Sequence, residues 1–113
     1  MASAAFGPKG TLILSGDTDG TVRIHRADDA GILRCASNAH DDMIHAVALG
    51  RTLAATGSDD GVVRLWRARD LRPIRRWQSD GGAVGAIRIT NRGRTVLVGF
   101  GDGSIREYAT KNG

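Results

Sequence analysis

The sequence predicts an all-β protein built from repeated β-hairpins. Its central stretch, residues 52–66, reads TLAATGSDDGVVRLW, in which two strand-like runs flank an Asp-Gly pair. Small, β-branched and aromatic residues in such runs favour extended backbone, and Asp-Gly between them favours a tight turn because glycine adopts positive φ without steric cost. Apolar residues along the chain are adjacent or alternate, and they lack the three- and four-residue intervals of an amphipathic helix.

The same hairpin occurs three times at a nearly constant interval. Residues 12–25 read LILSGDTDGTVRIH, and residues 96–108 read VLVGFGDGSIREY. The period is about 41 residues, which is typical of a four-stranded propeller blade. The aligned positions are the turn pairs Asp19 and Gly20, Asp60 and Gly61, and Asp102 and Gly103, the glycines Gly16, Gly57 and Gly99, the arginines Arg23, Arg64 and Arg106, and the ring-bearing residues His25, Trp66 and Tyr108.

These repeats resemble the WD40 family. Ala39-His40 stands where that family has Gly-His, and Trp66-Arg67 stands where it has Trp-Asp. The resemblance implies about three four-stranded antiparallel blades of a WD40-like β-propeller. Because a closed propeller needs about four to eight blades, we expect an incomplete propeller, open or closed by association. The predicted blades cover residues 3–36, 44–78 and 84–110.

Within each blade we expect an inner strand, the hairpin and an outer strand, in that order. The third blade lacks residues for an outer strand after its hairpin. Runs such as LILS and VLVG are apolar at successive positions, which indicates sheets covered on both faces. The first inner strand and the turn that follows it are predicted within residues 3–10, and the other inner strands at residues 44–49 and 84–90. The outer strands are predicted at residues 32–36 and 73–78.

The WD40 resemblance also implies a buried hydrogen-bonded network in the middle blade, made by His40, Thr56, Asp60 and Trp66. In this interpretation Asp60 orients the imidazole, the imidazole reaches the Thr56 hydroxyl, and that hydroxyl accepts a hydrogen bond from the indole. The role is structural rather than catalytic. In the first blade His25 stands at the position of the tryptophan.

Composition limits the remaining classes of function. The 113 residues carry a net charge of +4 and one cysteine, Cys35. They contain no apolar run long enough for a membrane helix. We therefore expect an intracellular protein, cytoplasmic or nuclear, with no membrane partner and no internal disulfide. The three histidines and Cys35 lack zinc-like spacing, and no Walker-type loop is present, so we expect no metal, cofactor or small-molecule substrate.

Two surfaces are candidates for partner binding. In WD40 propellers the loop-bearing face commonly docks peptides, and here it carries an acidic group, namely Asp41, Asp42, Met43 and Asp59. The second candidate is a basic stretch, which has two interpretations. It indicates either an anionic partner such as RNA, with Trp77 stacking on the bases, or an outer strand whose charges prevent edge-to-edge aggregation of the sheet. It consists of Arg64, Arg67, Arg69, Arg72, Arg75 and Arg76.

We therefore predict a non-catalytic scaffold that serves as a docking surface within a larger complex. An RNA- or ribonucleoprotein-associated protein is the alternative. An enzyme is disfavoured because the sequence lacks a recognisable nucleophile–base pair or convergent carboxylates. The partner is expected to be another protein, which includes another WD40 chain or a second copy that would form a homodimer.

Overall fold

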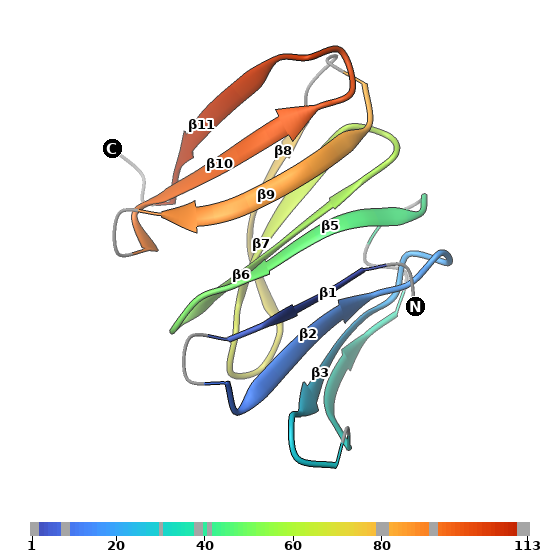
Figure 1. Ribbon diagram of the computed structural model, residues 1–113, viewed down its shortest axis with the longest axis vertical. Coiled ribbons are helices and arrows are strands. Elements are labelled where there is room, and N and C mark those ends of the chain that lie inside the picture. Colours follow the sequence, from blue (N-terminus) through green and yellow to red (C-terminus); the bar gives the residue numbers. More distant parts are fainter. Residues whose placement is uncertain are drawn as a thin grey trace.

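The computed structural model describes residues 3–7, 10–29, 31–37, 40, 42–78, 82–90 and 93–110. Within this part the regular structure is entirely β (Figure 1). The strands are β1 (Ser3–Phe6), β2 (Leu12–Gly16), β3 (Val22–Arg26), β4 (Ile32–Ala36), β5 (Ile44–Leu49), β6 (Leu53–Ser58), β7 (Val62–Arg67), β8 (Arg72–Gln78), β9 (Val84–Thr90), β10 (Thr95–Phe100) and β11 (Ile105–Ala109). No helix among the described residues could cross a membrane.

The strands form three antiparallel sheets, each made of strands consecutive in the chain. The first has the order β1-β2-β3-β4 and the second β5-β6-β7-β8. The third has three strands, β9, β10 and β11, within the described residues. The all-β class and the partial-propeller architecture predicted from the sequence are therefore confirmed.

The three sheets pack face to face, and their inner strands β1, β5 and β9 follow one another (Figure 1). Two apolar cores fill the spaces between them. One core joins the first and second sheets through residues such as Leu14, Ile24 and Trp66. The other joins the second and third sheets through residues such as Leu65 and Val98. Each core therefore belongs to a pair of sheets rather than to a single sheet.

The middle sheet shows why its strands are apolar at successive positions. Successive side chains of a strand point to opposite faces. Ala54 and Trp66 belong to the core shared with the first sheet, whereas Ala55 and Leu65 belong to the core shared with the third. All four side chains are at most 3% exposed. The apolar runs are therefore explained by burial on both sides.

Two equivalent glycines allow the sheets to approach closely. A Cβ at Gly16 would lie 2.4 Å from Ile44 Cγ2, and a Cβ at Gly57 would lie 2.4 Å from Val84 Cγ1. Both distances are far below van der Waals contact, so any side chain at either glycine would push the next inner strand away. Glycine at this repeat position therefore sets the spacing between sheets.

Candidate partner-binding surface and its supporting network

The described part of the predicted network joins three elements around one threonine. Thr56 of β6 is fully buried, and its hydroxyl lies 2.6 Å from His40 Nε2. The indole Nε1 of Trp66 on β7 donates to the same hydroxyl at 3.0 Å. His40 itself is 4% exposed. One hydroxyl thus satisfies two buried rings, which fixes the segment before β5 against the central hairpin.

Asp60 is hydrogen-bonded within the turn of the central hairpin. It accepts hydrogen bonds from the Ser58 hydroxyl and, at 3.1 Å, from the Val62 amide. Both partners lie in its own hairpin. The proposed contact between Asp60 and the His40 imidazole stays a prediction.

The turn aspartates of the three hairpins share one local geometry. Asp19, Asp60 and Asp102 each accept a hydrogen bond from the backbone amide two residues later. The following glycines, Gly20, Gly61 and Gly103, have φ angles of 85°, 81° and 89°. An aspartate that closes an Asx turn before a left-handed glycine explains why this pair recurs in the sequence.

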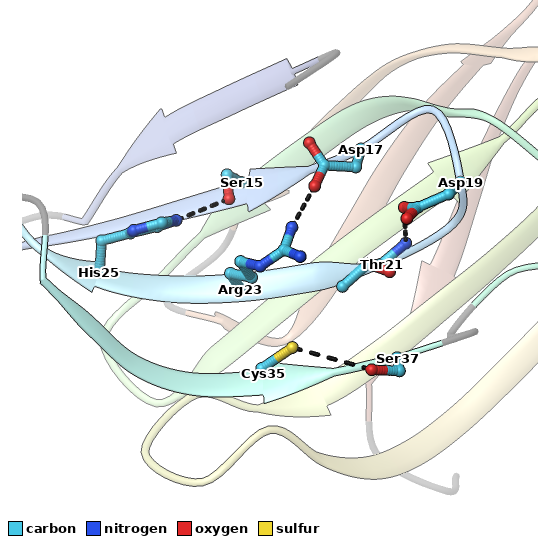
Figure 2. A network of polar contacts seen from close by, with 8 residues as sticks. All are labelled: Ser15, Asp17, Asp19, Thr21, Arg23, His25, Cys35 and Ser37. Atoms are coloured by element: carbon cyan, nitrogen blue, oxygen red, sulfur yellow. Dashed lines mark hydrogen bonds and ion pairs between the residues drawn. The ribbon is translucent and has the colours of Figure 1, made fainter.

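The first sheet contains a polar version of the same network on its outer face. Ser15 occupies the position of Thr56, and its hydroxyl lies 2.8 Å from His25 Nε2. Figure 2 shows the two side chains pointing toward each other. Arg23 pairs with Asp17 on the same sheet. In the third sheet Val98 replaces the hydroxyl residue. Among the described residues, a hydrogen bond between this hydroxyl and a histidine ring therefore occurs in the first and second sheets.

The predicted loop face is built at the end of the second sheet. Asp42 is exposed and accepts from the Met43 amide at 2.8 Å. The Asp59 amide donates to the Met43 carbonyl at 3.0 Å, and the Asp59 carboxylate lies 2.5 Å from His45 Nε2. The structure therefore brings Asp42, Met43 and Asp59 together. Asp41 lies outside the described residues.

Backbone hydrogen bonds connect this loop face to the first sheet. The His40 amide donates to the Gly20 carbonyl, and the Ile44 amide donates to the Asp17 carbonyl, each at 3.2 Å. An added Cβ at Gly20 would lie 2.1 Å from the His40 carbonyl oxygen. The turn of one sheet and the loop of the next are thus held in close contact, which preorganises the surface that they share.

A second repeated feature, which was not predicted from the sequence, lies at the opposite end of the strands. Arg67 donates to Asp70 at 2.5 Å, and Arg26 donates to Asp29 at 3.1 Å. The Arg67 guanidinium lowers the pKa of Asp70 to about 2. The detectable signal was the pair RADD and RARD at residues 26–29 and 67–70, separated by the same period as the hairpins.

The arginines of the basic stretch do not form one continuous group, because they lie at different positions on β7, on β8 and in the turn between these strands. Arg64 and Arg76 are cross-strand partners, as are Arg67 and Arg72. Trp77, expected as a stacking neighbour for RNA bases, instead stacks on Tyr108, with ring centroids 4.7 Å apart. Arg69 is exposed, and Arg75 is half-buried opposite Leu65.

Across the described part of the chain, no group of three or more His, Cys, Asp or Glu side chains is placed to hold a metal ion. Cys35 is exposed, and its sulfur lies 4.0 Å from the Ser37 hydroxyl (Figure 2). The polar groups described above bond to one another and to backbone, both within hairpins and between neighbouring segments. The loop face is therefore a surface whose backbone is fixed by hydrogen bonds, which is suited to binding a partner.

Comparison with solved structures places this architecture among β-propellers. A chain in the crystal structure of the mitotic checkpoint complex superposes with a TM-score of 0.87 at 19% identity, covering 96% of this chain and 34% of that one. The computationally designed Ika4 protein superposes with a TM-score of 0.77 at 22% identity, covering 88% of this chain and 60% of that one. The chain thus spans less than two thirds of either neighbour. These identities support the fold alone.

Comparison with family models identifies the repeat. The model described as WD domain, G-beta repeat matches residues 2–26 and 31–67, more than half of the 113 residues. The chain therefore belongs to the WD40 family. WD40 repeats generally mediate protein–protein interactions in complexes, and the family is generally non-catalytic. No curated protein matches the sequence.

Proposed function

We propose that this chain is a non-catalytic docking module within an intracellular complex, and that it binds a basic segment of a protein partner on the loop face. The loop face is defined by Asp41, Asp42, Met43 and Asp59. The proposal rests on one observation, which is that the Asp59 amide donates a hydrogen bond to the Met43 carbonyl. This bond joins the segment before β5 to the turn after β6, so the residues of the loop face are held together.

The chemistry of the face supports this type of partner. Asp42 is exposed, and Asp59 is half-buried beside His45. Met43 is also half-buried, and its thioether adapts to irregular apolar surfaces. Acidic groups around an adaptable apolar residue suit a peptide that presents Lys or Arg beside an apolar side chain, while the chain as a whole carries +4.

Affinity capture with matched variants tests the proposal. Asp42→Asn removes one exposed charge from the loop face, and Asp28→Asn removes one exposed charge from the turn between β3 and β4. We expect the first variant to lose a partner that the wild type and the second variant retain. Recovery should also fall with added salt, because exposed charge pairs are screened. Equal recovery by the two variants would contradict a role for the loop face.

An anionic partner on the basic stretch is the second candidate, and it rests on the cross-strand arginines. Like charges directly opposite each other destabilise a sheet. The pairs Arg64–Arg76 and Arg67–Arg72 place four guanidinium groups on β7 and β8. Asp70 pairs with Arg67. A bound polyanion would relieve this repulsion.

Retention on immobilised RNA across a salt series tests this second candidate. Binding by arginine–phosphate contacts predicts that the logarithm of affinity falls linearly with the logarithm of salt concentration. Arg72→Gln/Arg76→Gln should flatten that dependence, whereas Arg88→Gln/Arg94→Gln, the same charge change on the third sheet, should leave it unchanged. Salt-independent retention would exclude the basic stretch as an RNA site.

A further inference from the structure

The first and third sheets each leave one face uncovered by the described residues. The first sheet packs its Leu14 and Ile24 face on the second sheet. The third sheet packs its Val96 and Val98 face on the second sheet from the other side. The uncovered face of the third sheet is equivalent to the faces with which the first and second sheets pack on the sheet that follows them. The uncovered face of the first sheet is equivalent to the faces with which the second and third sheets pack on the sheet before them. Faces of these two kinds meet at both contacts within the chain.

Each uncovered face carries an apolar residue at a position that is covered elsewhere. Ile105 is 71% exposed, and its equivalents Val22 and Val63 are fully buried between sheets. Phe6 is 66% exposed, and its equivalents Leu49 and Ile89 pack against the two cores. Among the described residues these two are the most exposed large apolar side chains. Each uncovered face therefore presents an apolar side chain at a position that is used for inter-sheet packing elsewhere in the chain.

Polar substitutions also occur at matching positions of these two faces. Ile24 and Trp66 both belong to one core, and the equivalent Leu65 belongs to the other core, against which Tyr108 packs. On the uncovered faces the corresponding residues are Glu107 of the third sheet and His25 of the first. An acid thus replaces the aliphatic partner and an imidazole replaces the aromatic one. Where a third sheet packs on a first sheet in the same geometry, Glu107 and His25 therefore occupy facing positions.

We propose that two copies of this chain associate head to tail, with the third sheet of each packed on the first sheet of the other. This proposal names one partner of the docking module and rests on its sheet architecture. The contact repeats the geometry already used twice within the chain, and it places Glu107 of one copy beside His25 of its partner. Two such contacts close a ring of six sheets with two-fold symmetry.

The arrangement keeps β1 in its own sheet. β1 is hydrogen-bonded to β2 from Ser3 to Phe6, so an exchange in which β1 completes the third sheet of another copy would break an existing ladder. Arg88 lies on the uncovered face of the third sheet, across Leu97 from Glu107. This face therefore presents one charge of each sign around an apolar centre, which limits the partner faces that can pack on it.

The test uses one blocking substitution on each face. Ile105→Arg blocks the third sheet, and Phe6→Arg blocks the first; both side chains are exposed in the single chain, so each variant should retain the wild-type circular dichroism spectrum. Light scattering should give wild type a mass of about twice 11.9 kDa. Either variant alone should be a single chain, because each ring contact joins one third sheet to one first sheet and each variant blocks one of these two faces in every copy.

Each outcome decides the proposal. Ile74→Arg, at a 46% exposed residue of the middle sheet, is the control and should pair like wild type. A single-chain mass for wild type, or a mass that keeps rising with concentration, would overturn the two-copy ring. Self-pairing by Phe6→Arg would also overturn it, because that result requires two third sheets to meet. None of these variants alters the loop face, so partner capture can survive a failure here.

Discussion

Replacing Thr56 with valine tests the central network most sharply. The substitution nearly preserves shape but removes a fully buried hydroxyl that lies 3.0 Å from Trp66 Nε1 and 2.6 Å from His40 Nε2. Each buried polar group that loses its partner costs about 1–3 kcal/mol. With two rings affected, we expect the free energy of unfolding to fall by about 2–4 kcal/mol.

The assay is urea unfolding followed by far-ultraviolet circular dichroism, which does not depend on the tryptophan being changed. A double-mutant cycle with Trp66→Phe separates the hydrogen bond from packing, and we expect the double variant to lose about 1 kcal/mol less than the sum of the single changes. Thr52→Val makes the same chemical change at an exposed position. It should stay within about 0.5 kcal/mol of wild type. Additive losses, or a Thr56→Val variant as stable as wild type, would refute the reasoning.

Two further predictions concern sheet spacing and acid stability. Gly57→Ala should destabilise the fold by about 1–3 kcal/mol, because its Cβ would lie 2.4 Å from Val84 Cγ1. Gly99→Ala should be neutral or stabilising in urea unfolding, because an added Cβ there would lie 4.0 Å from Ala86 Cβ. Equal effects of the two substitutions would contradict the role of Gly57 in sheet spacing. The Arg67 hydrogen bond lowers the pKa of Asp70 to about 2, so this pair stabilises the fold above the unfolded-state pKa of about 3.9. That contribution is lost as the pH falls from about 4 through about 2. The stability advantage of wild type over Asp70→Asn should therefore vanish near pH 2, and a pH-independent difference would contradict it.

The hairpins were predictable because their determinants are local. Asp-Gly fixes each turn through an aspartate that bonds two residues ahead and a glycine with positive φ. The period then placed Thr56 and Trp66 in one blade. The sheet spacing was not predictable in the same way, because the contact between Gly57 and Val84 joins two sheets and depends on their twist and separation.

Polar partners were harder to predict than strands. Asp60 bonds within its own hairpin to Ser58, a choice that depends on rotamers rather than on residue spacing. The Asp59–His45 contact arises because a bulge in β5 shifts the register after Ile44. A bulge re-aims a side chain without a distinctive residue pattern. The sequence therefore predicted a loop face, but it did not predict the contacts that organise these residues in the structure.

Photo-crosslinking from the loop face tests the account most directly. A photoreactive amino acid at position 43 would stand between the exposed Asp42 and the turn that carries Asp59, while the same group at position 74 would lie on the outer strand of the middle sheet. Irradiation in cells should give a discrete protein adduct from position 43 and none from position 74. Adducts from both positions alike, or from position 74 alone, would contradict docking through the loop face.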